Sequence, residues 1–266
     1  MCGTVLAEGL PAMAMTPDTV TREIWATRDE VRLHAVEWRP RGAELGVPIL
    51  CIGGALSKGA NAKEFGIAAA SGALGLPRRL ISPDRRGMGE SFAPTSGYTP
   101  VEFTKDNESI VAAANLQNFV VFGHSLGVPI AIAYVLRHRE SVRGLVLGDY
   151  PALWPRLSEE WLARALAVFD GTWDRDALTQ LQRESVETRY WDELATLEVR
   201  VLAITGTSGV LMKPDDAERY RKACGATSVV TIDGGDHSLT VNGDHAPFFA
   251  IVRGFLAEVD RRRPTA

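Results

Sequence analysis

The chain has 266 residues, of which 45% are hydrophobic and 23% are charged, and these figures predict one globular domain with a sizeable core. The net charge of −4 argues against nucleic-acid binding, since proteins that neutralise phosphates carry a basic surplus. Charges or glycines interrupt every apolar run, so we expect no membrane span. The three cysteines, Cys2, Cys51 and Cys224, form no CxxC pair. This pattern argues against a disulfide frame or a metal site and favours a reducing, cytoplasmic compartment.

The first 20 residues lack the positive stretch of a secretory signal, and we expect them to form a flexible N-terminal arm. Apolar segments of strand length follow at residues 23–27, 31–38, 48–52, 79–82, 119–122, 144–148, 199–205 and 228–232. The charged turn at 28–30 predicts that the first two strands form an antiparallel hairpin. Helix-like stretches alternate with the later strands, which predicts an α/β fold with a mainly parallel sheet flanked by helices.

Residues 151–198 interrupt this alternation, because a crossover between parallel strands needs only a dozen or more residues. The segment carries ten Asp and Glu against five Arg. It also holds four of the six tryptophans, which are Trp154, Trp161, Trp173 and Trp191. We expect an acidic helical cap over a substrate pocket, inserted into a core formed by residues 21–150 and 199–262. The alternative is a helical elaboration that never touches substrate.

The strand at 119–122 runs directly into GHSLG at 123–127, and a helical stretch follows at 128–137. A G-x-S-x-G sequence between a strand and a helix predicts a sharp turn that exposes its serine, here Ser125, as a nucleophile. Both glycines are expected because side chains at these positions would collide with neighbouring elements. The N-terminus of the following helix favours negative charge at this point.

A serine nucleophile requires a base, and a histidine late in the chain is expected. His237 lies in the glycine-rich segment DGGDHS, between the last predicted strand and the helical stretch at 245–259. We predict that His237 is this base, with His245 as the weaker substitute. The glycine-containing loop after the third predicted strand, at 53–57, suits an oxyanion hole. We assign its donors as the backbone amides of Ala55 and Leu126.

These residues resemble the α/β-hydrolase family over residues 21–259. Besides GHSLG, the segment DRRGMGES at 84–91 is similar to the D-x-R-G-x-G-x-S turn of that family. The segment WDEL at 191–194, ahead of the strand at 199–205, is similar to the return from a cap. The resemblance implies an eight-stranded sheet with a cap, and a Ser-His-acid triad that performs acyl chemistry without a cofactor or a metal. Gly53 departs from the family pattern, which often has histidine there.

The acid of the triad departs further from the family. In most members it follows the strand equivalent to 199–205, but the loop at 206–212 contains no carboxylate, and Gly209 stands where aspartate is expected. The family's other solution places the acid after the preceding strand, which here ends at Asp149. Both strand ends open on the face of Ser125, so a carboxylate from either one can reach His237. We therefore assign Asp149, with Asp215, Asp216 or no acid as alternatives.

A serine at position 125 disfavours halide and epoxide chemistry, which needs a carboxylate there. The acidic cap disfavours polyanionic substrates, and its tryptophans favour apolar groups. We predict hydrolysis of a carboxylic ester, thioester or lactone of a small apolar molecule, by a monomer or homodimer. The alternative is a binder, lyase or cyclase that forms no acyl-enzyme. The residues expected to line the substrate site are Gly54, Leu56, His124, Tyr150, Trp154 and Trp161.

Overall fold

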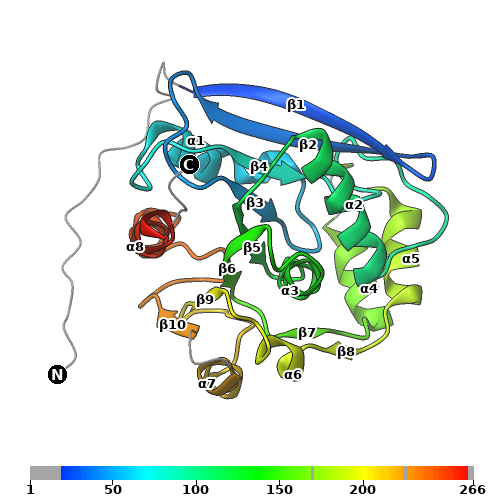
Figure 1. Cartoon of the computed structure of the whole chain (residues 1–266). Helices are drawn as coiled ribbons and strands as arrows, with labels where there is room; N and C mark the ends of the chain where they lie inside the picture. The colour runs from blue at the N-terminus through cyan, green and yellow to red at the C-terminus, as the bar shows by residue number, and fades with distance from the viewer. Residues whose placement is uncertain (1–18, 169–170, 224–226, 263–266) are drawn as a thin grey trace.

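A computed structural model of the protein describes residues 19–168, 171–223 and 227–262. Figure 1 shows a twisted sheet with helices on both sides. Its eight strands lie in the order β1-β2-β4-β3-β5-β6-β9-β10. Their bounds are Thr19–Arg28 (β1), Val31–Pro40 (β2), Ile49–Ile52 (β3), Leu80–Pro83 (β4), Phe119–His124 (β5), Val142–Gly148 (β6), Arg200–Thr205 (β9) and Thr227–Thr231 (β10). The predicted fold class, a mostly parallel eight-stranded sheet flanked by helices, is confirmed.

The first two strands form the expected antiparallel hairpin, but it is longer than the sequence pattern indicated. Thr19 and Val20 pair with Pro40 and Arg39. The arm expected over residues 1–20 was therefore drawn two residues too long, because β-branched side chains at 19 and 20 continue the strand along a partner of equal length. The rest of that segment, residues 1–18, lies outside the described residues.

The strands whose following loops hold the predicted site residues are parallel. β2 pairs with β4 in antiparallel fashion, whereas β4, β3, β5, β6, β9 and β10 run parallel to one another. The carboxyl ends of β3, β5, β6 and β9 consequently meet at one edge of the sheet. In open α/β sheets this edge is where ligands bind.

The helices cover the two faces of the sheet and give it two cores. Residues of α2 (Pro100–Ala113), α3 (Gly127–Arg137) and α7 (Pro214–Ala223) share one buried cluster. Residues of α1 (Lys63–Ser71) and α8 (Ala246–Arg261) share the other, and the short helix η1 (Gly59–Ala62) leads into α1. The central strands read as near-continuous apolar runs because both of their faces are covered.

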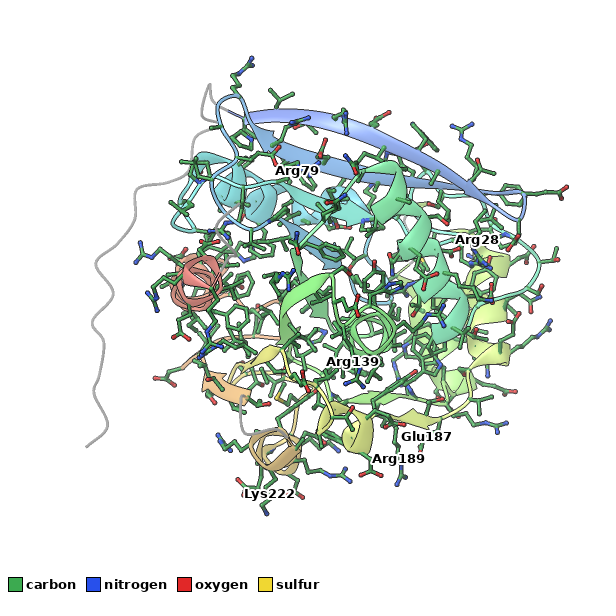
Figure 2. All side chains as sticks on the ribbon, viewed as in Figure 1. Arg28, Arg79, Arg139, Glu187, Arg189 and Lys222 are labelled. Carbon is green, nitrogen blue, oxygen red and sulfur yellow. The ribbon has the colours of Figure 1, made fainter. Side chains whose placement is uncertain are left out.

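The segment at 151–198 leaves the sheet and returns to it. It contains α4 (Glu159–Ala167), α5 (Arg175–Glu184), α6 (Trp191–Leu194) and a two-stranded sheet of β7 (Leu153–Trp154) and β8 (Thr188–Arg189). The short strands are an addition to the all-helical insertion that we expected. Glu187 and Arg189 form an exposed ion pair at 2.8 Å and lie at the periphery of this segment (Figure 2).

In the ranges given above, no helix is both long and apolar enough to span a membrane.

Cys51 is a free thiol in the core, and burial raises its pKa to about 12. A thiol with that pKa is protonated and unreactive at neutral pH. Cys2 and Cys224 lie outside the described residues.

Candidate active site

Ser125 lies at the sharp turn between β5 and α3. Its φ angle is 53°, in the left-handed region that a non-glycine residue occupies only when the surrounding structure enforces it. The flanking glycines make the turn possible, because a Cβ at Gly127 would lie 2.2 Å from the Ile52 carbonyl oxygen. A Cβ at Gly123 would lie 2.7 Å from the Cβ of Ala131. The backbone thus holds the serine above the carboxyl edge of the sheet.

A continuous chain of hydrogen bonds joins the three residues proposed as a triad. The Ser125 hydroxyl Oγ lies 3.0 Å from His237 Nε2. The other ring nitrogen, Nδ1, lies 2.7 Å from Asp149 Oδ2. The Asp149 side chain is fully buried, whereas one third of the His237 side chain is exposed. Both distances are within the reach required for proton transfer.

Asp149 is held by three further hydrogen bonds. Its Oδ1 accepts the hydroxyl of Thr205 at 2.7 Å and the amide of Met212 at 3.1 Å, and its Oδ2 accepts the amide of Leu211 at 2.9 Å. Burial by itself would raise the pKa of Asp149, but the hydrogen bonds from His237 and these three groups lower it. The carboxylate is therefore ionised at neutral pH and keeps the proton of His237 on Nδ1.

The loop after β9 explains how the acid can come from β6. Gly209 occupies the expected aspartate position at a φ of 61°, in open space. The same loop turns the amides of Leu211 and Met212 toward Asp149. The loop thus supplies donors for a carboxylate that the neighbouring strand carries, in place of a carboxylate of its own.

The other candidates lie elsewhere. Asp215 and Asp216 are in the first turn of α7, where Asp216 accepts the Lys213 amide. His245 precedes α8 and lies 3.3 Å from Glu64. In the described part of the chain, the structure brings His237 and Asp149 to Ser125 and does not bring these alternatives there.

The residues predicted for the oxyanion hole lie next to the serine. A Cβ at Gly54 would lie 2.9 Å from the Cβ of Ser125, so the Gly54 backbone rests directly against Ser125. Within the described residues, neither the Ala55 nor the Leu126 amide donates a hydrogen bond. Two free amides beside a nucleophile, one of them at the start of α3, suit a developing negative charge.

His124 contacts His237, the predicted base. Its Nε2–H donates to the His237 carbonyl oxygen at 2.7 Å, and the two rings lie 4.9 Å apart. Burial lowers the pKa of His124. A neutral His124 next to His237 does not oppose the positive charge that a general base gains during catalysis.

The other predicted substrate residues occupy different depths. Leu56 and Trp161 are partly buried and pack against a small cluster of Met88, Ala165, Trp173 and Leu178. Tyr150 is half-buried, and its carbonyl accepts the hydroxyl of Tyr220. Trp154 has no exposed surface and packs on Phe103, with ring centroids 5.7 Å apart, so it belongs to the core between the inserted segment and α2.

Sequence reasoning missed two residues that touch these groups. Thr205 donates to Asp149. Arg85 donates from Nη2 to the carbonyl oxygens of Gly53 and Gly54, at 3.0 Å each. Thr205 ends β9, which the register Gly148↔Ile204 places beside the end of β6, and this pairing is visible only in the fold. Arg85 lies inside the segment DRRGMGES at 84–91, whose resemblance to the family turn assigns no role to this residue.

Comparison with known proteins identifies the class. The family model of the alpha/beta hydrolase fold matches residues 48–194, more than half of the chain. The chain therefore belongs to the α/β-hydrolase fold family.

Three individual proteins show the range of similarity. Proline iminopeptidase of Neisseria gonorrhoeae is 29% identical over 117 residues, 43% of this chain and 36% of that protein. The match thus spans about a third of this relative's length. Among solved structures, an esterase from Rhodococcus sp. ECU1013 has a TM-score of 0.71 at 21% identity, over 90% of this chain and 99% of that one. An enzyme that degrades N-acyl homoserine lactones has a TM-score of 0.71 at 18% identity, over 87% and 99%.

Proposed function

We propose that this protein is a serine hydrolase that cleaves a carboxylic ester, thioester or lactone of a small apolar molecule through an acyl-enzyme on Ser125. The hydrogen-bonded chain from Ser125 through His237 to Asp149 carries the proposal. It unites a nucleophile, a base and an acid that orients the base, in the order this chemistry requires.

The first half of the reaction forms the acyl-enzyme. Ser125 Oγ attacks the carbonyl carbon of the substrate while His237 Nε2 takes the hydroxyl proton. The carbonyl oxygen becomes an oxyanion that accepts hydrogen bonds from the amides of Ala55 and Leu126. His237 then returns the proton to the leaving oxygen or sulfur, the bond to the leaving group breaks, and the acyl group stays on Ser125.

Water completes the reaction by the same route in reverse. His237 removes a proton from water, the hydroxide attacks the acyl carbon, and the proton returns to Ser125 Oγ as the carboxylic acid leaves. Throughout both halves, ionised Asp149 stabilises the positive charge on His237.

The substrate class follows from what surrounds the oxyanion hole. Leu56 is the neighbour of Ala55 in the chain, and it packs against the apolar cluster that includes Trp173 and Leu178. An acyl group whose carbonyl reaches Ala55 would therefore meet apolar side chains. This supports an aliphatic or aromatic acyl group over a charged one.

Turnover of acyl esters, thioesters, lactones and N-terminal proline anilides tests the proposal, because fold relatives include an esterase, a lactone-degrading enzyme and a peptidase. We expect esters or lactones to turn over faster than anilides. A fluorophosphonate should label Ser125, and Ser125→Ala should lose at least about 10⁴-fold in kcat. Absence of label on Ser125, or unchanged turnover in the variant, would support a binder, lyase or cyclase without an acyl-enzyme.

A further inference from the structure

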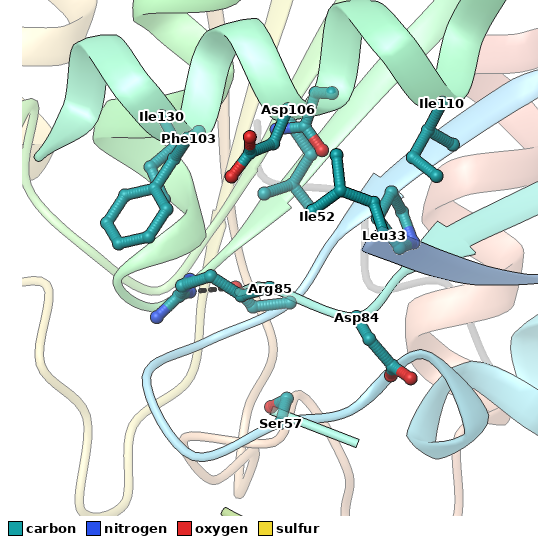
Figure 3. Close-up of a pocket in the computed structure, with 12 residues that line it drawn as sticks. Leu33, Ile52, Ser57, Asp84, Arg85, Phe103, Asp106, Ile110 and Ile130 are labelled. Carbon is teal, nitrogen blue, oxygen red and sulfur yellow. Dashed lines mark hydrogen bonds between the residues drawn. The ribbon is translucent and has the colours of Figure 1, made fainter. Parts of the chain in front are cut away.

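Arg85 follows β4 and lies beneath the oxyanion loop, which we define as residues 53–57. Its Nη2 donates to two consecutive carbonyl oxygens of that loop, those of Gly53 and Gly54, at 3.0 Å each. The guanidinium carbon lies 5.1 Å from the centre of the Phe103 ring. Figure 3 shows the side chain between the loop and the helix that carries Phe103, with its contact to the loop as a dashed line. Arg85 is thus fixed from two sides.

Among the residues that the structure describes, the charge of Arg85 has no counter-ion. In the described part of the chain, no carboxylate lies within 4.0 Å of its guanidinium, whereas the adjacent Arg86 pairs with Asp106 at 2.7 Å. Burial lowers the pKa of Arg85 to about 10, so the group remains a cation at neutral pH. Arg85 is half-buried, with its Nη1 atom buried. A cation withdrawn from water without a carboxylate partner is costly, and carbonyl dipoles offset only part of that cost.

The Nη1 nitrogen, at the other end of the guanidinium, is a second sign that this group lacks a partner within the described residues. Arg85 Nη1 is buried and has no hydrogen-bond partner among the described residues. Arg85, Gly53 and Ser57 line a cavity of about 20 Å³, which is room for about one water molecule. Asp84 and Asp106 line the same cavity, but neither forms an ion pair with Arg85, and the hydrogen bonds of the guanidinium go to the oxyanion loop.

The contact with Gly54 helps to fix how the next amide points, together with the Ser57 amide, which donates to the same carbonyl at 3.3 Å. In a trans peptide the C=O and N–H groups point in opposite directions, and the described residues contain no cis peptide. When Arg85 binds the Gly54 carbonyl, it turns the Ala55 N–H to the other side of the peptide. Gly54 itself rests against Ser125, since its Cβ would lie 2.9 Å from the Ser125 Cβ. A hydrogen bond from a cation to the carbonyl also polarises the amide and strengthens its N–H as a donor.

We propose that Arg85 is a positioning residue of the oxyanion hole. It fixes the Gly54–Ala55 peptide so that the Ala55 amide meets the substrate oxygen, and its positive charge compensates the oxyanion through that peptide. This inference rests on the proposed function of Ser125. It places on Arg85 an electrostatic contribution that is realised only when negative charge develops, so its loss affects kcat rather than KM.

The test compares two arginines at opposite ends of β4. Arg78 is fully buried, whereas Arg85 is half-buried. Arg78 also donates to backbone carbonyls, those of Val47 and Leu74, but it precedes the strand and pairs with Asp260. Arg78→Gln should lower the unfolding temperature and leave kcat within about twofold. Arg85→Gln should lower kcat about 10²-fold, the scale of losing an oxyanion donor, and leave KM within about threefold. Arg85→Lys, which keeps the charge but not the fork, should fall between Arg85→Gln and the unsubstituted protein.

Two readouts separate positioning from a structural role. A trifluoromethyl ketone, which forms an oxyanion on Ser125, should lose affinity in Arg85→Gln by the same factor as kcat/KM. Added guanidinium ion at non-denaturing concentration should restore part of kcat to Arg85→Ala. Full stoichiometric labelling of Arg85→Gln by fluorophosphonate, at a reduced rate, would keep the Ser125 chemistry intact. Failure to label the unsubstituted protein would instead overturn the function itself.

Retention of kcat and ketone affinity within about threefold in Arg85→Gln would overturn the proposal. A loss confined to KM, or the absence of rescue by guanidinium, would also overturn it. If Arg85→Gln does not fold, Arg85→Lys decides by the same criteria: a fall in kcat with matched loss of ketone affinity supports the proposal, and unchanged values contradict it.

Discussion

The carboxyl edge of the sheet and the inserted segment at 151–198 hold their residues in different ways. At the edge, Ser125 and Asp149 adopt positive φ angles of 53° and 45°, and Asp149 is bound by backbone amides from the neighbouring loop. The inserted segment is joined to the turn at 84–91 by two backbone hydrogen bonds, Gly89 N–H to the Thr172 carbonyl and Asp174 N–H to the Gly87 carbonyl. Its helix α4 packs through side chains, and only Ala165 is buried in it.

Under the proposed function, this difference assigns the chemistry to the edge of the sheet and the selectivity to the inserted segment. Backbone geometry allows little variation, so the reacting groups are fixed to within tenths of an ångström. Side-chain packing tolerates substitutions of similar volume. We therefore expect changes at the edge to abolish turnover, and changes in the inserted segment to alter which substrate is turned over.

The largest effect is expected at the base. His237→Ala removes the group that lies 3.0 Å from Ser125, and kcat should fall by about 10⁶-fold. His245→Ala is the matched control, since His245 is the other late histidine and contacts Glu64. It should keep kcat within about twofold. Equal losses of kcat in the two variants would contradict the assignment of the chemistry to the edge of the sheet.

The acid should have the second-largest effect. Asp149→Asn keeps the shape of the side chain but stabilises the wrong tautomer of His237, and a loss of about 10⁴-fold in kcat is expected. Asp215→Asn, in the first turn of α7, should leave kcat unchanged. Kinetics with one ester substrate measures both variants. Full activity in Asp149→Asn would contradict its assignment as the acid, and would leave Asp215, Asp216 or a site without an acid.

The same acid links stability to pH. Its hydrogen bonds lower the pKa of Asp149 in the folded protein, below the unfolded value of about 3.9. The resulting stabilisation is complete above the unfolded value and is lost as the pH falls through the folded pKa. The cost of Asp149→Asn in free energy of unfolding should therefore be larger at about pH 7 than at about pH 3. Urea denaturation at the two pH values measures it, and an equal cost at both would contradict the linkage.

The next-largest loss of kcat is expected at Gly54, because its backbone touches Ser125. In Gly54→Ala the new methyl group would lie 2.9 Å from the Cβ of Ser125, so the oxyanion loop or the serine must shift. Misplacement of about 1 Å costs about 10²-fold in rate. Gly254→Ala is the control: Gly254 lies within α8, in open space, and alanine there should stabilise the helix by about 1 kcal/mol. Retained kcat in Gly54→Ala would show that the loop is less rigid than its contacts indicate.

The sequence predicted the parts of this molecule that are set by local pattern. The strands, the hairpin and the turn at Ser125 each require particular residue types in one short segment, such as the glycines of GHSLG. Asp149 could be proposed because two adjacent parallel strands end at one edge, so either end can carry the acid. Arg85 and Thr205 could not be found in this way. Each touches groups that lie more than 30 residues away in the chain, and only the fold brings them together.

Trp154 is a residue that the sequence placed in the substrate site and that the fold instead buries in the core. Its place among the acidic and tryptophan-rich residues suggested contact with a substrate, but packing on Phe103 buries it completely. Composition reports which side chains a segment holds, and it does not report which way they face. Trp161, by contrast, is partly buried and packs against the cluster that also contacts Leu56.

The smallest effect on turnover is therefore expected at Trp161. Trp161→Ala removes an indole from the cluster next to the oxyanion loop and should leave kcat for an acetyl ester within about threefold, since no reacting group moves. The space left by the indole should admit one to two further methylene groups of a long acyl chain. Trp161→Ala should therefore raise kcat/KM for long acyl chains relative to short ones by about tenfold. Trp154→Phe, which keeps an aromatic ring in the core, should leave that ratio unchanged. A chain-length series of p-nitrophenyl esters measures both ratios. If Trp161→Ala lowered kcat for every ester by one common factor, the inserted segment would be acting on the chemistry itself, and the division between the two regions would fail.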